Sequence, residues 1–395
     1  MSLYPLTGVV RPYAWGSRTI LAKLQGRPVP SEGPEAELWL GAHPGDPSTV
    51  TRPDGRISLA TLIADDPKGQ LGAEAAGEFG SRLPYLMKVL AADAPLSLQA
   101  HPDAEHARRA YAAQEADPAA PRNYTDPYHK PEMLVALTPL EALCGFRAPD
   151  VSAAVLEELD LPRLASVVAA LRAGVTGLRD AVRILLTWPA DDRPDLVDAV
   201  VAAAGAQPRS RYAKSHALAV ELAGHYPGDP GVLVALLLNH VRLEPGEAIW
   251  MPAGNLHAYL NGAGVEIMAA SDNVLRGGLT PKRVDVGELL RVLRFEVLEE
   301  PVLSPVEIGP GVVTWPVPAR EFVLYRLRVT PTAPSLAVPG SGPRIVLGTE
   351  GEVVVQDWDR VAVRVGMGAA AYAPADAGPL TVTGAGEVFV AAVPE

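Results

Sequence analysis

The hydrophobic period of the sequence changes twice along the chain, and this change limits the folds that the chain can adopt. Between residues 151 and 243, apolar residues recur at the three- and four-residue spacing of amphipathic helices, as in VSAAVLEELDLPRLASVVAALRAG and SHALAVELAGHY. On either side, short apolar runs, alternating apolar and polar residues, and frequent Pro and Gly are typical of strands joined by turns. We therefore predict a mainly β protein with an inserted α-helical domain over residues 151–243.

The two β-regions are expected to form separate domains, because 395 residues are too many for one ordinary hydrophobic core. After residue 303 the sequence becomes rich in Val and Gly, as in PRIVLGTEGEVVVQ and LTVTGAGEVFVAAV. We expect a first β domain from residues 1–150 and 244–302, and a second, smaller β domain from residues 303–395.

Charge and composition exclude several classes of function. The net charge of -12, without a basic stripe, argues against a nucleic-acid-binding protein, and it means that any anionic ligand must be held by a few local cations. Cys144 is the only cysteine, which excludes a disulfide framework and a cysteine-based zinc site. No signal-like N-terminus and no membrane-length apolar run is present, so we expect a cytoplasmic protein that does not enter a membrane.

The segment LSLQAHP places three polar side chains on one face of a predicted strand. Leu96, Leu98 and Ala100 alternate with polar residues, and successive side chains of a strand point to opposite faces. The polar residues are Ser97, Gln99 and His101. A strand with a polar face toward solvent is the simpler interpretation, and a cavity is indicated only if other segments supply partners.

A second segment, HKPEMLVALTPLEALCGF, supplies such partners. Pro131 favours an extended conformation for the residue before it, so Lys130 and Glu132 share a face of the strand that follows. A surface ion pair between these two residues, contributing less than about 1 kcal/mol, is the alternative.

The third segment has the most specific spacing. Its ordered positions are Gly246, Pro252, Gly254, His257 and Asn261. This spacing resembles the second motif of the cupin β-barrels, in which a strand at the Pro-x-Gly turn points a histidine into the barrel to bind a metal. His257 and Tyr259 should then share the inward face, whereas the alternative for His257 is a hydrogen-bonded core histidine.

Together the three segments offer two imidazoles, a carboxylate and an amide oxygen as metal ligands. With Gln99, His101, Glu132 and His257 around a 2+ ion, the net charge of the site would be about +1. Such a site is an open Lewis acid, and oxygen and nitrogen ligands of this kind also accept manganese, cobalt or iron.

Several segments, in the same order, resemble the type I mannose-6-phosphate isomerases. They are YAWGS, PEAELWLGAHP, LPYLMKVLAADAPLSLQAHPD, HKPEMLVALTPLEALCGFR and NLHAYLNGAGVEIMAASDNVLRGGLTPK. The resemblance covers about residues 1–300 and implies an enzyme that interconverts mannose 6-phosphate and fructose 6-phosphate. It also implies one zinc ion per chain, held by Gln99, His101, Glu132 and His257, and two cupin-type jelly-roll β-barrels with an inserted helical domain.

The resemblance assigns further roles residue by residue. The catalytic arginine of the family falls on Arg276, and the family's phosphate and substrate contacts fall on Ser97, Lys130 and Lys282. Two departures are modest, because Gly277 stands where alanine is usual and NLH replaces the commoner PH before the metal histidine.

The C-terminal region imitates the cupin spacing only in part. Gly368 and Pro374 match it, but no histidine follows them. We therefore expect the second cupin-like domain to be free of metal.

The implied isomerisation moves a proton between adjacent carbons through a cis-enediolate, whose negative oxygen needs positive groups nearby. Zinc and Arg276 would supply them. The candidate proton carriers are His129, Lys130 and Tyr259; we favour His129 with Lys130 and assign Tyr259 to substrate binding. Two further carboxylates are candidates for orienting these groups: Asp272 and Glu266.

Two other functions remain open at this point. One is a non-catalytic double-cupin protein that binds sugars, because a fold alone does not settle function. The other is a cupin isomerase for a different phosphosugar. In each case the expected partner is a small molecule, and we expect a monomer.

Overall fold

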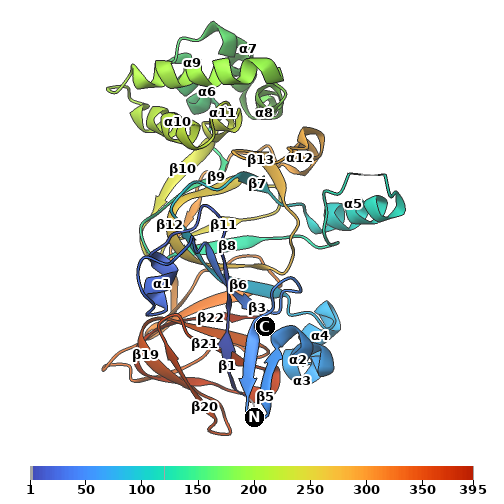
Figure 1. The fold of residues 1–395 in the computed structure, drawn as a ribbon, viewed down its shortest axis with the longest axis vertical. Coiled ribbons are helices and arrows are strands. Elements are labelled where there is room, and N and C mark those ends of the chain that lie inside the picture. The colour runs from blue at the N-terminus through green and yellow to red at the C-terminus, as the bar shows by residue number, and fades with distance from the viewer. Residues whose placement is uncertain (1–2, 120, 395) are drawn as a thin grey trace.

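The computed structural model of the chain describes residues 3–119 and 121–394. Two β-sheets lie one above the other along the long axis of the molecule, and a bundle of helices lies beyond the upper sheet (Figure 1). The prediction of a mainly β architecture with helices is thereby confirmed. Within the described residues, no helix is both long and apolar enough to cross a lipid bilayer.

The upper sheet has 11 strands among the residues described. They are β2 (Val9–Arg11), β3 (Glu37–Gly41), β6 (Tyr85–Ala92), β7 (Leu98–Ala100), β8 (Glu132–Ala136), β9 (Leu140–Phe146), β10 (Leu238–Leu243), β11 (Ala248–Met251), β12 (His257–Ala269), β13 (Leu275–Gly278) and β14 (Val302–Leu303). The longest of them, β12, pairs with β6 and β8 through its second half and with β9 and β7 through its first. The sheet therefore consists of two groups of strands that share β12.

Gly262 allows β12 to change its partners. Its φ is +101°, and a Cβ atom at this position would lie 2.5 Å from the carbonyl oxygen of Pro139. Any other residue would be strained and would collide with the neighbouring backbone.

The space between the two groups of strands has an apolar core. Its buried members include Leu90, Leu134, Leu140, Ala142, Cys144, Val241, Ile249, Met251 and Tyr259. Because strand side chains alternate, Glu132 faces the same interior as Leu134, and His257 faces the same interior as Tyr259. The strands thus direct polar groups into an otherwise apolar space.

The lower sheet also has 11 strands in the described part of the chain. They are β1 (Tyr4–Thr7), β4 (Thr49–Arg52), β5 (Gly55–Ser58), β15 (Val306–Gly309), β16 (Val312–Thr314), β17 (Val323–Val329), β18 (Ser335–Ala337), β19 (Arg344–Gln356), β20 (Ala362–Gly366), β21 (Ala370–Ala373) and β22 (Thr381–Ala392). The N-terminal strands β1, β4 and β5 belong here because β1 pairs with β21. This differs from the expected division, in which all of residues 1–150 joined the first β domain.

The two sheets pack through a shared core that contains residues from both. Two buried side chains connect them by hydrogen bonds to backbone. The Tyr85 hydroxyl of the upper sheet donates to the Pro343 carbonyl at 3.0 Å, and the Trp315 indole donates to the Gly246 carbonyl at 3.0 Å. Burying these polar groups with partners avoids a desolvation penalty and fixes how the sheets meet.

The helical bundle lies between β9 and β10 in the sequence. Its elements are α6 (Pro149–Glu157), η1 (Pro162–Leu164), α7 (Ala165–Arg172), η2 (Gly174–Gly177), α8 (Leu178–Leu186), η3 (Ala190–Asp192), α9 (Arg193–Gly205), α10 (Ala213–His225) and α11 (Gly231–Ala235). The helices end at Ala235, earlier than the predicted residue 243, because the alternating LNHVRL segment pairs as β10 with β9. Apolar side chains of the bundle share one core with Leu98 and Leu256 of the upper sheet.

The remaining helices lie around the two sheets (Figure 1). They are α1 (Ile20–Leu24), α2 (Leu59–Asp65), α3 (Pro67–Leu71), α4 (Ala73–Phe79), α5 (Ala104–Ala116), α12 (Val286–Val292) and η4 (Ala375–Ala377).

Candidate metal centre

Three predicted metal ligands meet inside the upper sheet. Glu132 begins β8, His257 begins β12, and His101 directly follows β7. Their ligand atoms lie within 4.8 Å of one another, and all three side chains are buried. The Nε2 atoms of His101 and His257 each lie 3.2 Å from Glu132 Oε2.

The hydrogen bonds of the two histidines define which ring nitrogens face the cluster. His101 Nδ1 lies 2.6 Å from the carbonyl oxygen of Asn273, and His257 Nδ1 lies 3.1 Å from that of Asn255. A carbonyl only accepts, so each Nδ1 must carry the proton, and in a neutral ring Nε2 then presents a lone pair. His257 Nε2 is buried and has no hydrogen-bond partner among the described residues. Among the described residues, two lone pairs and Glu132 Oε2 therefore converge without a proton donor, an arrangement that a divalent cation satisfies.

The charge states of the cluster also suit a metal. Burial lowers the pKa of His101 to about 4, so this imidazole is neutral at neutral pH. Burial opposes ionisation of Glu132, but the adjacent Lys130 ammonium favours the carboxylate, and the pKa of this carboxyl lies well below its usual value. Lys130 Nζ lies 2.8 Å from Glu132 Oε1, which leaves Oε2 to face the histidines. This ion pair is buried, so the alternative of a surface pair does not describe it.

Gln99 and Arg276 lie in the same row of residues as His257. In the register of the strands, Gln99 of β7 is opposite both His257 of β12 and Arg276 of β13. Directly opposed residues of antiparallel strands project from the same face, with Cβ atoms about 4.5–5.5 Å apart. The half-buried Gln99 amide and the Arg276 guanidinium therefore border the cluster of His101, Glu132 and His257, which we call the metal cluster.

Arg276 makes no ion pair or hydrogen bond through its side chain with the residues that the structure describes. Burial lowers the pKa of this guanidinium, although it stays charged at any ordinary pH. A half-buried cation without a protein partner is costly unless an anion binds to it. Arg276 thus marks a place for negative charge beside the metal cluster.

A second buried charge network borders the site. Lys88 Nζ lies 3.2 Å from Glu266 and 3.6 Å from Glu37, and the Tyr259 hydroxyl donates to Glu266 at 2.8 Å. Burial alone would lower the pKa of Lys88, but Glu37 and Glu266 outweigh it and raise this pKa. Burial and the Glu266 carboxylate raise the pKa of Tyr259 well above its usual value, so its phenol stays protonated.

Lys88 is a buried residue of this network that the sequence pattern does not single out. The only available signal was a single charged residue within the apolar run LPYLMKVLAA, and a charged residue is rarely buried in such a run without a partner. The structure shows that strands distant in sequence supply the partners.

Three other predicted residues lie around the cluster. Half-buried Ser97 precedes Gln99 by two residues. His129 is hydrogen-bonded to Glu321 at 2.6 Å, in the region before β17. Asp272 pairs with His43 at 2.9 Å.

Lys282 lies on the surface, where it lines a cavity of about 430 Å³ together with Thr280 and Arg193. The metal ligands do not line this cavity. The structure thus places Lys282 in a neighbouring cavity and not in direct contact with the cluster.

Asn273 holds the loop that leads to Lys130. Its amide group donates to the carbonyl oxygens of Asp126 at 2.7 Å and Tyr128 at 2.8 Å, and its amide oxygen accepts from Thr125 N at 2.9 Å. Its own carbonyl oxygen accepts the Nδ1 proton of His101. This buried residue therefore joins the loop and the metal cluster, a role that nothing in its sequence context indicated.

Comparisons with known proteins agree with this geometry. A family model described as "Phosphomannose isomerase type I, catalytic domain" matches residues 3–149. The mannose-6-phosphate isomerase of Salmonella typhimurium is 35% identical over 406 residues, covering 97% of each chain. The Bos taurus protein of that name is 34% identical, covering 83% of this chain and 82% of its own.

Solved structures give the same result. A structure described as zinc-bound mannose 6-phosphate isomerase has a TM-score of 0.91 and 33% identity, with all of both chains covered. A mutant of phosphomannose isomerase from Salmonella typhimurium also has a TM-score of 0.91, at 33% identity and full coverage. Both sequence and fold match over nearly the whole length, and the chain therefore belongs to the type I mannose-6-phosphate isomerase family.

Proposed function

We propose that this protein is a zinc-dependent aldose-ketose isomerase that interconverts mannose 6-phosphate and fructose 6-phosphate. The observation that carries the proposal is the buried cluster of His101, Glu132 and His257 with the unpaired Arg276 in the adjacent row of residues. The relatives named mannose-6-phosphate isomerase supply the substrate. A protein that only bound sugars would not need convergent lone pairs beside an unpaired cation.

One zinc ion would be held by His101, Glu132 and His257, with the Gln99 amide oxygen as a fourth ligand. When bound, it would supply a Lewis acid that polarises oxygens of the sugar. The carbonyl groups of Asn273 and Asn255 would keep both imidazoles in the ligating tautomer.

The side chains suggest how a proton could move between the two sugar carbons through the cis-enediolate. Arg276 would lie against the negative oxygens of this intermediate. Among the candidate carriers, Lys130 is next to the cluster, whereas the His129 ring is bonded to Glu321 and the Tyr259 phenol donates to Glu266. Lys130 is therefore the better supported proton carrier, with Tyr259 and Ser97 lining the substrate site.

The finer architecture is part of the same proposal. We infer two cupin-type jelly-roll units, a catalytic one mainly from residues 1–150 and 244–302 and a metal-free one mainly from residues 303–395, with most of residues 151–243 as an inserted helical domain. The two strand groups that share β12 support the first unit, and the pairing of β1 with β21 means that the N-terminal strands help to build the second. A monomer in the cytoplasm is also proposed.

A coupled assay tests the proposed function. Purified protein is incubated with mannose 6-phosphate, and fructose 6-phosphate is measured with and without a chelator and with zinc added back. Turnover that a chelator abolishes and zinc restores is the expected result. Binding of mannose 6-phosphate without turnover would favour the sugar-binding alternative, and faster turnover of glucose 6-phosphate would assign another phosphosugar.

Replacing Asn273 with alanine should lower zinc affinity by about 10–100-fold, the range for losing a group that orients a metal ligand. The loop at residues 125–128 would lose its clamp, and the Asn273 carbonyl would hold His101 less firmly. Zinc affinity is measured by competition with a chelating dye. Asn123→Ala is the control, because its amide binds Asp285 instead of this loop. Equal affinity in both variants would show that Asn273 does not orient His101.

Lys282→Ala should raise KM for mannose 6-phosphate by about 10–100-fold and leave zinc content unchanged, if Lys282 binds the distal phosphate. This range follows from about 1.5–3 kcal/mol for a hydrogen bond to a charged group. Steady-state kinetics on this variant and on the exposed Lys214→Ala variant of α10 measure the effect. An unchanged KM would mean that the cavity around Lys282 does not take the phosphate.

A further inference from the structure

A cavity of about 530 Å³ lies between the two sheets, away from the metal cluster. On the upper side it is lined by α1, by the turn after β8 and by the turn before β11; on the lower side it is lined by β17, β19 and β22. Val89 of β6 lines it, and the neighbouring Lys88 faces the opposite side of that strand. The cavity is therefore separated from the metal cluster by the upper sheet.

Arg326 is the most informative residue of this cavity. Its side chain is only 24% exposed, yet it forms no hydrogen bond with the described residues, and its Nε lies 3.7 Å from Glu387 Oε2. That oxygen already accepts from Arg328 Nη2 at 2.9 Å and Nε at 3.1 Å, while Glu387 Oε1 accepts from Thr349 at 3.1 Å. Arg326 thus keeps hydrogen-bond donors without a protein acceptor in a largely buried position, which favours an anionic ligand.

The backbone leaves room for this guanidinium. Gly246 has a φ of +94°, and a Cβ atom there would lie 3.0 Å from Arg326 Nη1. The Arg326 guanidinium also lies 5.8 Å from the centre of the Trp315 ring. The guanidinium is therefore flanked by the Trp315 ring, and the absence of a side chain at residue 246 leaves space for it.

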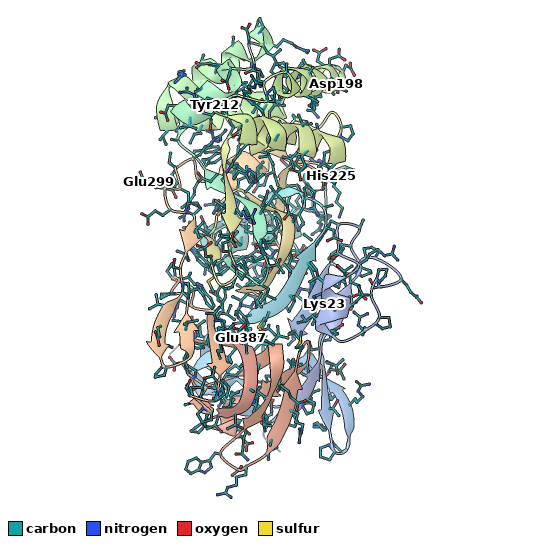
Figure 2. The ribbon with its side chains drawn as sticks, turned by 90° about the vertical axis from the view of Figure 1, so that its left-hand side faces the viewer. Lys23, Asp198, Tyr212, His225, Glu299 and Glu387 are labelled. Carbon is teal, nitrogen blue, oxygen red and sulfur yellow. The ribbon has the colours of Figure 1, made fainter. Side chains whose placement is uncertain are left out.

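The cavity has a local excess of positive charge. Three of its lining residues are cations and two are carboxylates, namely Lys23, Arg326, Arg328, Glu350 and Glu387. Figure 2 labels Lys23 on the upper side of this junction and Glu387 on the lower side. Glu387 is already engaged by Arg328, so Lys23 and Arg326 remain available in a chain whose net charge is -12. The charge complements a small anion.

The remaining walls are mainly apolar and define the rest of the ligand. They include Ile20, Leu24, Leu137, Met367 and Phe389. An apolar or aromatic body would be buried favourably against these walls. The volume is in the range of pockets that hold small organic molecules.

We propose that this cavity is a second binding site, distinct from the metal centre, for a small organic anion with an apolar or aromatic body. Arg326 and Lys23 would bind the anionic group, and the apolar walls would bury the body. Because its two sides come from the two sheets, an occupant would contact both halves of the molecule. The proposal does not depend on the proposed isomerase activity.

Titration of the zinc-loaded protein with 8-anilinonaphthalene-1-sulfonate, followed by fluorescence, tests the site because this probe joins an aromatic body to one anionic group. We expect saturable binding at one site per chain. Arg326→Leu should weaken it by about 10-fold or more, the loss expected for a hydrogen bond to a charged group. Lys23→Glu should also weaken it, and this exposed substitution does not touch the core, so it tests the site even if Arg326→Leu does not fold.

Two matched variants complete the experiment. Arg320→Leu removes an exposed arginine that pairs with Glu78, and Arg276→Gln removes the cation beside the metal cluster; neither should change the affinity for the probe. The proposal would be overturned if the probe showed no saturable binding. It would also be overturned if Arg326→Leu and Lys23→Glu both bound the probe with the affinity of the wild-type protein. Weaker binding in Arg276→Gln would place the probe at the metal centre and would overturn it as well.

Discussion

Replacing His257 with alanine should remove zinc from the protein and abolish isomerase activity. In the proposed site the imidazole would supply one of two nitrogen ligands, and its Nε2 has no hydrogen-bond partner among the described residues. Losing a group that merely orients a ligand typically costs about 10–100-fold in metal affinity, so losing the ligand itself should cost more than about 100-fold. The Glu132 carboxylate would keep Lys130 as its partner, so the variant should still fold.

Zinc content by elemental analysis, together with the rate of mannose 6-phosphate conversion, measures this effect. His240→Ala is the matched control, because His240 also lies 3.0 Å from a glutamate, Glu141, but at an exposed position of β10. It should retain zinc and activity. A His257→Ala protein with stoichiometric zinc and normal turnover would show that the cluster is not the metal site.

The residues of the metal cluster could be predicted from the sequence because each of them belongs to a short segment with a recognisable pattern of apolar and polar residues. His101, Glu132 and His257 lie at or directly beside a strand end, and alternation in each strand identifies the face that carries them. Alternation does not indicate which strands pair. The family resemblance and the cupin spacing supplied that information, and the structure brings the three side chains together.

Lys88 and Asn273 show what local patterns cannot reveal. Lys88 is buried in the middle of β6 because Glu37 of β3 and Glu266 of β12 neutralise it. These partners are far away in the sequence, and only the register of the sheet brings them together. Asn273 lies in a loop, where no periodicity indicates burial, and its role depends on contacts with another loop.

Local sequence patterns also do not indicate which of the two sheets a strand joins. The segment YPLT alternates as any strand with one buried face does, and its pattern fits either sheet. It joins the lower sheet because Tyr4 and Leu6 are buried in the core shared by both sheets and β1 pairs with β21, more than 360 residues later. The sequence therefore predicts that this segment forms a strand, but not which strand it pairs with.

Arg276→Gln should lower kcat much more than it raises KM. Arg276 is half-buried, has no partner among the described side chains, and lies in the same row as Gln99 and His257. Negative charge develops on the enediolate oxygens only as the proton leaves carbon, so a guanidinium beside them interacts more strongly with the transition state than with the sugar. Losing one such donor typically costs roughly 2.7–4 kcal/mol, or about 10²–10³ in kcat.

Two further variants test whether the charge of Arg276 or the planar geometry of its guanidinium matters, and whether the effect is specific to this arginine. Arg276→Lys should recover only part of the loss, because one ammonium group cannot reproduce the planar fork of the guanidinium across two neighbouring oxygens. Arg242→Gln removes an exposed arginine of β10 that lies 3.3 Å from Glu244, and it should leave the kinetics unchanged. Steady-state kinetics normalised to bound zinc decide between the roles, since zinc content should stay at the wild-type level in all three variants. A raised KM with unchanged kcat would reassign Arg276 to ground-state binding of the substrate, because an interaction of equal strength in both states cannot accelerate the chemical step.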